Sequence, residues 1–138
     1  MSQDLGIEVR LTCSHAEAID RVTVALKAEG FGVLTRVDID KAFKDKIGAD
    51  FRPYTILGAC NPGLAHTALT SKPEIGLMLP CNVTVESAED DNGCLVRITD
   101  PKSMMQMGSL GAEESIQSVA RDASDRLGRV AEYLNAGA

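Results

Sequence analysis

The segment 57–69, LGACNPGLAHTAL, carries the residues of this chain that are best suited to chemistry. Cys60 ends an apolar run, and Asn61 and Pro62 are residue types favoured at the N-cap and the first position of a helix. Because the amides and dipole of a helix N-terminus stabilise a thiolate, Cys60 could act as a nucleophile or as a soft-metal ligand. His66 lies one turn further along the expected helix. The segment therefore predicts a ligand site centred on Cys60.

Ordinary packing is the alternative for these residues, since cysteine is often buried as a small apolar side chain. Cys13, Cys81 and Cys94 are in phase with apolar residues of their strands, which favours a place in the core. Cys60 lies in a strand that is apolar on both faces, so the strand period leaves its role open. For His66 an ordinary place on the helix surface is the simpler interpretation.

Motifs for other chemistries are missing from the sequence. It has no His-x-x-x-His, Cys-x-x-Cys or Glu-x-x-His spacing, no phosphate-binding loop and no Gly-x-Ser-x-Gly elbow. Met104, Met105 and Met107 could supply thioether ligands to Cu(I). A loop whose flexible methionines close an edge of the core is the simpler interpretation. The sequence therefore favours binding over catalysis.

Composition narrows the classes of partner. The 138 residues carry 14 Lys and Arg against 20 Asp and Glu, a net charge of −6, with 4% aromatic residues and no Trp. An acidic chain repels phosphate backbones, so we expect no nucleic-acid partner. No apolar stretch approaches the ~20 residues that span a bilayer, so we expect no membrane partner. The first residues lack signal-peptide features, so we expect a cytoplasmic protein whose cysteines are free thiols.

The elements that must position Cys60 follow from hydrophobic periodicity. Residues 7–13 alternate as a half-buried strand, and Ser14 with Glu17 forms a capping box that begins a helix ending at Gly30. Asn92-Gly93 is a hairpin signal between two strands. The other predicted elements are strands at 31–39, 51–60, 77–87 and 94–99, and helices at 41–47, 62–71 and about 113–134.

This order, β-α-β-α-β-α-β-β-α, predicts an α/β two-layer sandwich in a single domain, residues 1–138, with a mixed sheet of about five strands. The strand around Ile56, the helix from Pro62 and the strand around Val83 suggest a right-handed βαβ crossover. Such a crossover would place Cys60 at the carboxyl edge of the sheet, where ligands commonly bind.

The segments DFRPYTILGACNPGLAHTAL and EIGLMLPCNVTV carry a family resemblance. With GACNP and LPCNV in this order, the chain resembles the domain-of-unknown-function 302 (DUF302) family over nearly its whole length. The resemblance implies a compact α/β domain that forms homodimers, and it implies no reaction. The family pattern holds cysteine at both Cys60 and Cys81. Two thiols near one helix start would make a better soft-ligand or redox site than either alone, and Asn82 could offer a hydrogen bond.

We therefore expect a small cytosolic homodimer that binds a small ligand, such as a soft metal or a sulfur species, at a cleft near Cys60. The expected site residues are Cys60, Asn61, His66, Cys81 and Asn82. Two alternatives stay open. One is a non-catalytic interaction module that uses the helix from Glu113 and the methionine loop as its surface. The other is a thiol redox or transfer enzyme with Cys60 as nucleophile. No cofactor is specified.

Overall fold

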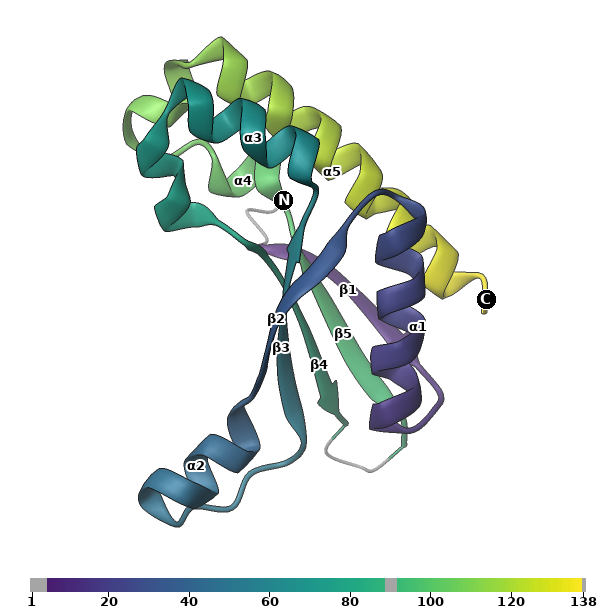
Figure 1. Ribbon diagram of the computed structural model, residues 1–138. Coiled ribbons are helices and arrows are strands. Elements are labelled where there is room, and N and C mark those ends of the chain that lie inside the picture. The colour runs from purple at the N-terminus through teal and green to yellow at the C-terminus, as the bar shows by residue number, and fades with distance from the viewer. Residues whose placement is uncertain (1–4, 89–91, 138) are drawn as a thin grey trace.

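A five-stranded sheet with helices on one face forms the framework of the protein (Figure 1). The computed structural model describes residues 5–88 and 92–137. The strands are β1 (Gly6–Leu11), β2 (Gly32–Asp38), β3 (Tyr54–Cys60), β4 (Cys81–Ser87) and β5 (Cys94–Thr99), arranged β1-β5-β4-β3-β2. The α-helices are α1 (His15–Ala28), α2 (Ile39–Ile47), α3 (Pro62–Ser71), α4 (Pro101–Met104) and α5 (Glu114–Asn135), and two 3-10 helices are η1 (Pro73–Met78) and η2 (Gly108–Ala112).

The predicted strand and helix order is confirmed, with α4, η1 and η2 as additions. The prediction of a mixed sheet is wrong, because all strand pairs formed by the described residues are antiparallel. The predicted βαβ crossover is therefore wrong as well. The chain leaves the sheet at the end of β3, and α3 and η1 bring it back to the same end of the sheet. β4 then runs antiparallel beside β3, with Ala59 opposite Cys81. Hydrophobic periodicity predicts a strand but carries no information on its direction.

The core lies between the sheet and helices α1 and α5. α1 begins as the capping pattern predicts, with the Glu17 amide donating to Ser14 Oγ at 3.2 Å. Cys94 is buried in this core, as its strand phase predicts. The helix predicted at about 113–134 is confirmed as α5, and it buries one apolar stripe. Its buried members are Ile116, Ala120, Ala123, Leu127, Val130, Ala131 and Leu134.

α5 is longer than the sheet that it covers. Its C-terminal part packs with the large core under α1. Its first turns, with Ile116 and Ala120, form a second apolar cluster with Ala68 of α3, Ile75 and Met105. α3 therefore packs against α5 beyond the end of β3 and β4 (Figure 1). Because α5 extends past the sheet, the ends of β3 and β4 and the helices α3 and α5 surround a common space.

The sheet face opposite the helices carries a network of charges. Glu86 of β4 is 3% exposed and accepts a hydrogen bond from Arg52 Nε at 2.6 Å and another from Arg97. Arg97 also pairs with Glu8 at 2.9 Å. Burial alone would raise the pKa of Glu86, but the bonds from Arg97 and Arg52 outweigh it and hold the pKa below its ordinary value. The Glu86 carboxylate thus joins β4 to β5 and to the segment before β3, and Arg97 extends the network to Glu8 of β1.

Replacing Glu86 with glutamine is expected to destabilise the fold in a pH-dependent manner. At pH 7 the loss should be about 1.5–3 kcal/mol, as for hydrogen bonds to a charged group. A lowered folded-state pKa gives stability that is present above the unfolded-state pKa, about 4.3, and is lost as pH falls through the folded-state value. The difference between wild type and Glu86→Gln in urea unfolding should therefore shrink below about pH 4. If wild type and variant differed in free energy of unfolding by the same amount at pH 7 and below pH 4, this role of Glu86 would be contradicted.

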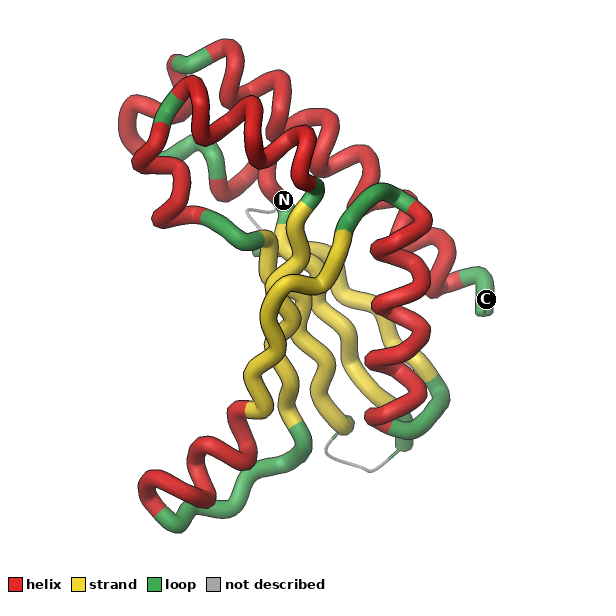
Figure 2. The backbone as a smooth tube through the Cα atoms, viewed as in Figure 1, coloured by secondary structure: helices red, strands yellow, loops and turns green. Residues whose placement is uncertain are grey.

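α2 stands apart from the rest of the molecule. Figure 2 shows the helices gathered beside the strands except for α2, which projects from the ends of β2 and β3. None of its residues is buried. The backbone amide of Tyr54 donates to Asp40 Oδ1 at 3.1 Å, and the rings of Phe43 and Phe51 meet edge to face at 5.4 Å. The projecting helix is therefore ordered locally while its apolar residues remain exposed.

Candidate functional site

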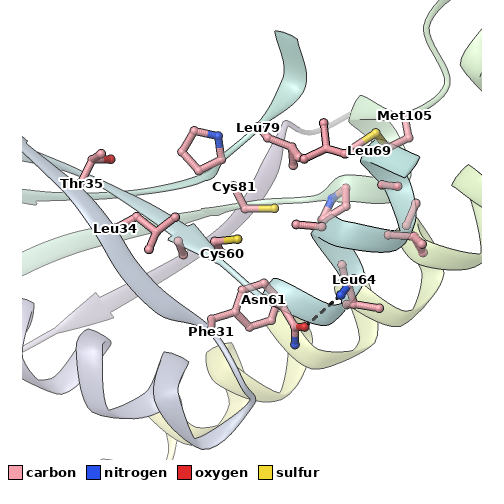
Figure 3. Close-up of a pocket in the computed structure, with 18 residues that line it drawn as sticks. Phe31, Leu34, Thr35, Cys60, Asn61, Leu64, Leu69, Leu79, Cys81 and Met105 are labelled. Atoms are coloured by element: carbon pink, nitrogen blue, oxygen red, sulfur yellow. Dashed lines mark hydrogen bonds between the residues drawn. The ribbon is translucent and has the colours of Figure 1, made fainter. Parts of the chain in front are cut away.

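A cavity of about 310 Å³ lies at the end of the sheet, where β3 and β4 meet α3 and α5 (Figure 3). Its wall is built from the end of β3, the start of β4, the segment 31–35, one side of α3, α4 with Met105, and the first half of α5. Among the described residues that line it, the polar side chains other than the cysteines are those of Thr35 and Asn61. No charged side chain among the described residues lines it.

The start of α3 brings Cys60 to this cavity. Asn61 is the N-cap and Pro62 the first helical residue, as predicted, and Asn61 Oδ1 accepts from the Leu64 amide at 3.2 Å. Gly30, at φ 85°, lies in the loop between α1 and β2 and lets that loop approach Asn61. A Cβ atom added at Gly30 would lie 2.9 Å from Asn61 Nδ2. The cap thus fixes the direction in which the chain leaves β3. Because Asn61 Oδ1 is used by the cap, this residue mainly positions Cys60.

Cys60 and Cys81 share the wall of the cavity. Cys81 pairs with Ala59, the residue before Cys60, and both thiols are free and partly exposed. Figure 3 shows both sulfur atoms on the cavity side of their strands. Burial, with a smaller contribution from neighbouring Cys60, raises the pKa of Cys81 to about 11. At neutral pH the Cys81 sulfur is therefore a neutral thiol.

Two predicted site residues lie elsewhere. His66 is exposed on α3 and does not line the cavity. The residues of that helix that face the cavity are Leu64, Ala65, Ala68 and Leu69. Asn82 follows Cys81 in β4, so its side chain points to the opposite face of the sheet. There it lines an open groove of about 670 Å³. The structure therefore brings together Cys60, Asn61 and Cys81, without His66 or Asn82.

Other cavity residues were not anticipated from the sequence. Phe31, Leu64 and Ala120 line the wall, and Met105 is buried in it, which agrees with a packing role for the methionine loop. The sequence signal that could have indicated Ala120 is the length of the apolar stripe on α5. The stripe is longer than a strand of the sheet, so its first turns must face something other than the sheet. Within residues 5–88 and 92–137, no group of three or more His, Cys, Asp or Glu side chains could hold a metal.

The antiparallel sheet, its one-sided helices and the cysteine-bearing cavity define an α+β domain of a known type. The family model "Domain of unknown function DUF302" matches residues 7–134, so the chain belongs to this family. Its structure resembles the crystal structure of an uncharacterized conserved DUF302 protein from Bacillus stearothermophilus, with a TM-score of 0.82 and 27% identity. That match covers 94% of this chain and 97% of the other.

Longer proteins also contain a similar segment. Over 104 residues, 75% of this chain, it is 32% identical to the fluoride-specific ion channel FluC 1 of Brucella suis biovar 1 and to that of Brucella abortus biovar 1. The chain spans 40% and 37% of those two proteins, so their named activity refers to much longer chains. In the described part of this protein, no helix has the length and apolar character needed to cross a membrane.

Proposed function

We propose that this domain binds a small, uncharged and largely apolar molecule in the cavity beside Cys60 and Cys81. The observation that carries this proposal is the composition of the cavity wall, whose described residues are apolar apart from Thr35, Asn61 and two thiols. An ionised ligand would lose its hydration there without gaining a charged partner, which is costly. An apolar ligand would gain from leaving water. Pockets of this kind are common sites for small molecules.

The cavity volume bounds the ligand. An engineered apolar cavity of about 150 Å³ holds benzene, so a cavity of about 310 Å³ suits a molecule of about 10–12 non-hydrogen atoms. At an efficiency of about 0.5 kcal/mol per non-hydrogen atom, between the values for very small and for drug-sized ligands, a ligand of this size would bind with about 5.5 kcal/mol. This free energy corresponds to a Kd of about 100 µM.

The test is a titration with 2-naphthol, which is uncharged, has a suitable size and changes its emission when its hydroxyl group leaves water. We expect one site per chain with a Kd of about 100 µM. Naphthalene-2-sulfonate supplies a matched control, because it has the same rings and a fixed negative charge. Its binding should be at least about tenfold weaker, since its charge finds no partner in the cavity. Equal binding of both compounds, or of neither, would contradict the proposal.

The thiol redox or transfer enzyme is less well supported. A thiol nucleophile acts as its thiolate, and the pKa of Cys81, about 11, keeps that residue protonated at neutral pH. The described cavity wall supplies no charged group to activate Cys60. The interaction module built on α5 is also less well supported, because the apolar stripe of that helix is buried in the domain itself.

We also propose that the protein is a cytoplasmic homodimer, and that α2 with the adjoining open face of the sheet forms the dimer surface. Val37, Ile47 and Phe51 expose large apolar side chains there. Phe51 stacks under the Arg52 guanidinium at 4.5 Å, and aromatic residues and Arg are typical of protein interfaces. A projecting helix and an uncovered sheet face on one chain suit a two-fold arrangement in which each copy covers the other. All four cysteines are free, which suits a reducing compartment.

A further inference from the structure

The two thiols of the cavity form a pair within an apolar wall. Cys60 ends β3 and Cys81 begins β4, so the backbones that carry them are neighbours in the sheet. Figure 3 shows both sulfur atoms on the cavity side of these two neighbouring strands. Both line the cavity, together with the thioether-bearing Met105. A compound with affinity for sulfur would therefore meet two thiols at once on entering.

Charge balance decides which kind of compound fits. A soft metal cation would have to displace both thiol protons into solvent. A monovalent ion such as Cu(I) would also leave the site with a net charge of −1, in a wall with no charged side chain among the described residues. The described residues also offer no third His, Cys, Asp or Glu to complete a metal site. An uncharged compound whose leaving groups carry the thiol protons away as water avoids both costs. The wall thus favours a neutral compound that exchanges hydroxyl groups for thiols.

We propose that Cys60 and Cys81 form a dithiol site for uncharged, thiol-seeking compounds with an apolar substituent, of which a trivalent organic arsenical is the simplest example. In the reaction of phenylarsonous acid, two As–O bonds break and two As–S bonds form. Each thiol proton leaves with a hydroxide as water, and arsenic stays trivalent. Reactants and product carry no net charge. The inference rests on the proposed function, since the compound must enter the cavity.

The volume of the cavity agrees with this class of ligand. A phenyl ring needs about the space of the 150 Å³ cavity that holds benzene, which is half of the volume present here. The ring would lie among the apolar side chains of α3 and α5, with the arsenic atom at the thiols. Cys13 and Cys94 provide an internal control. They are also near each other, with Cys94 Sγ 3.5 Å from the Cys13 carbonyl oxygen, but they lie outside the cavity.

The test is native mass spectrometry and calorimetry of the full chain with phenylarsonous acid. We expect one adduct whose mass is that of the protein plus the ligand less two water molecules. Because both compounds would occupy the same cavity, 2-naphthol should reduce the formation of this adduct. Because two linked bonds form, Cys60→Ser and Cys81→Ser should each weaken binding at least about 30-fold, while Cys13→Ser should change it less than about twofold. Binding of 2-naphthol by the serine variants would show that their cavity is folded. The heat of binding should be the same in phosphate and Tris, since no proton is released.

The other possible results of these binding experiments distinguish failure of the dithiol site from failure of the cavity proposal. If 2-naphthol binds and the arsenical forms no adduct, the dithiol site is wrong and the cavity proposal stands. If neither compound binds, both proposals are wrong. An adduct that survives in Cys81→Ser, or that is lost in Cys13→Ser, would show that the Cys60–Cys81 pair is not the site.

Discussion

Replacing Ala65 with phenylalanine is expected to weaken the binding of 2-naphthol at least about 30-fold, which corresponds to about 2 kcal/mol. Ala65 lies on the side of α3 that faces the cavity and is only partly buried, so a ring at this position can enter the empty space. A phenyl ring would take up about half of the 310 Å³. The remaining volume would be too small for two fused rings.

His66→Phe is the matched control for this variant. It adds the same ring to the next residue of the same helix, on the exposed side. It should leave the Kd of 2-naphthol within about twofold of wild type, as expected for a surface change away from the ligand. The control also tests whether His66 contributes to the site. Equal losses in the two variants would show that binding is not located in the cavity.

Replacing Ile47 with glutamate is expected to raise the dissociation constant of the homodimer at least about 100-fold, or about 2.7 kcal/mol. Ile47 is 73% exposed on α2, so the charge should not affect the folding of the isolated chain. In the proposed dimer it would be buried against apolar surface without a partner. Sedimentation equilibrium on wild type and variant measures the change directly.

Leu77→Glu serves as the control for the dimer surface. Leu77 is 89% exposed on η1, which belongs to the opposite end of the molecule from α2 (Figure 1). This variant should associate as wild type does. A wild-type protein that stays monomeric at about 100 µM, a hundredfold above a micromolar Kd, would contradict the homodimer. A dimer lost in Leu77→Glu and kept in Ile47→Glu would place the interface elsewhere.

The parts of the fold that depend on local sequence were predictable. The Ser14 cap of α1, the Asn61 cap of α3 and the apolar stripe of α5 each follow from side chains within a few turns of one another. The direction of β4 beside β3 was not predictable in this way. It depends on α3 packing against α5 past the end of the sheet, which is a contact between segments far apart in the sequence.

The candidate site was predictable in part for the same reason. Strand phase placed Cys81 toward the helices, and the same alternation turns Asn82 away from the cavity that Cys60 lines. Cys81 and Asn82 both border a smaller cavity of about 160 Å³ beside Met104. Helical spacing likewise groups Ala65 with Ala68 and Leu69 and leaves His66 outside. The cavity itself arises from the first turns of α5, which no local pattern connects to Cys60.

Alkylation of Cys60 by N-ethylmaleimide, followed by peptide mass mapping, tests most directly whether this thiol lies in a cavity open to small neutral molecules. At a 2-naphthol concentration ten times its Kd, mass action leaves about one site in eleven free. The rate at Cys60 should therefore fall about tenfold, while the rate at Cys13 stays the same. An unchanged rate at Cys60 with 2-naphthol bound would show that the ligand and the thiol do not share the cavity.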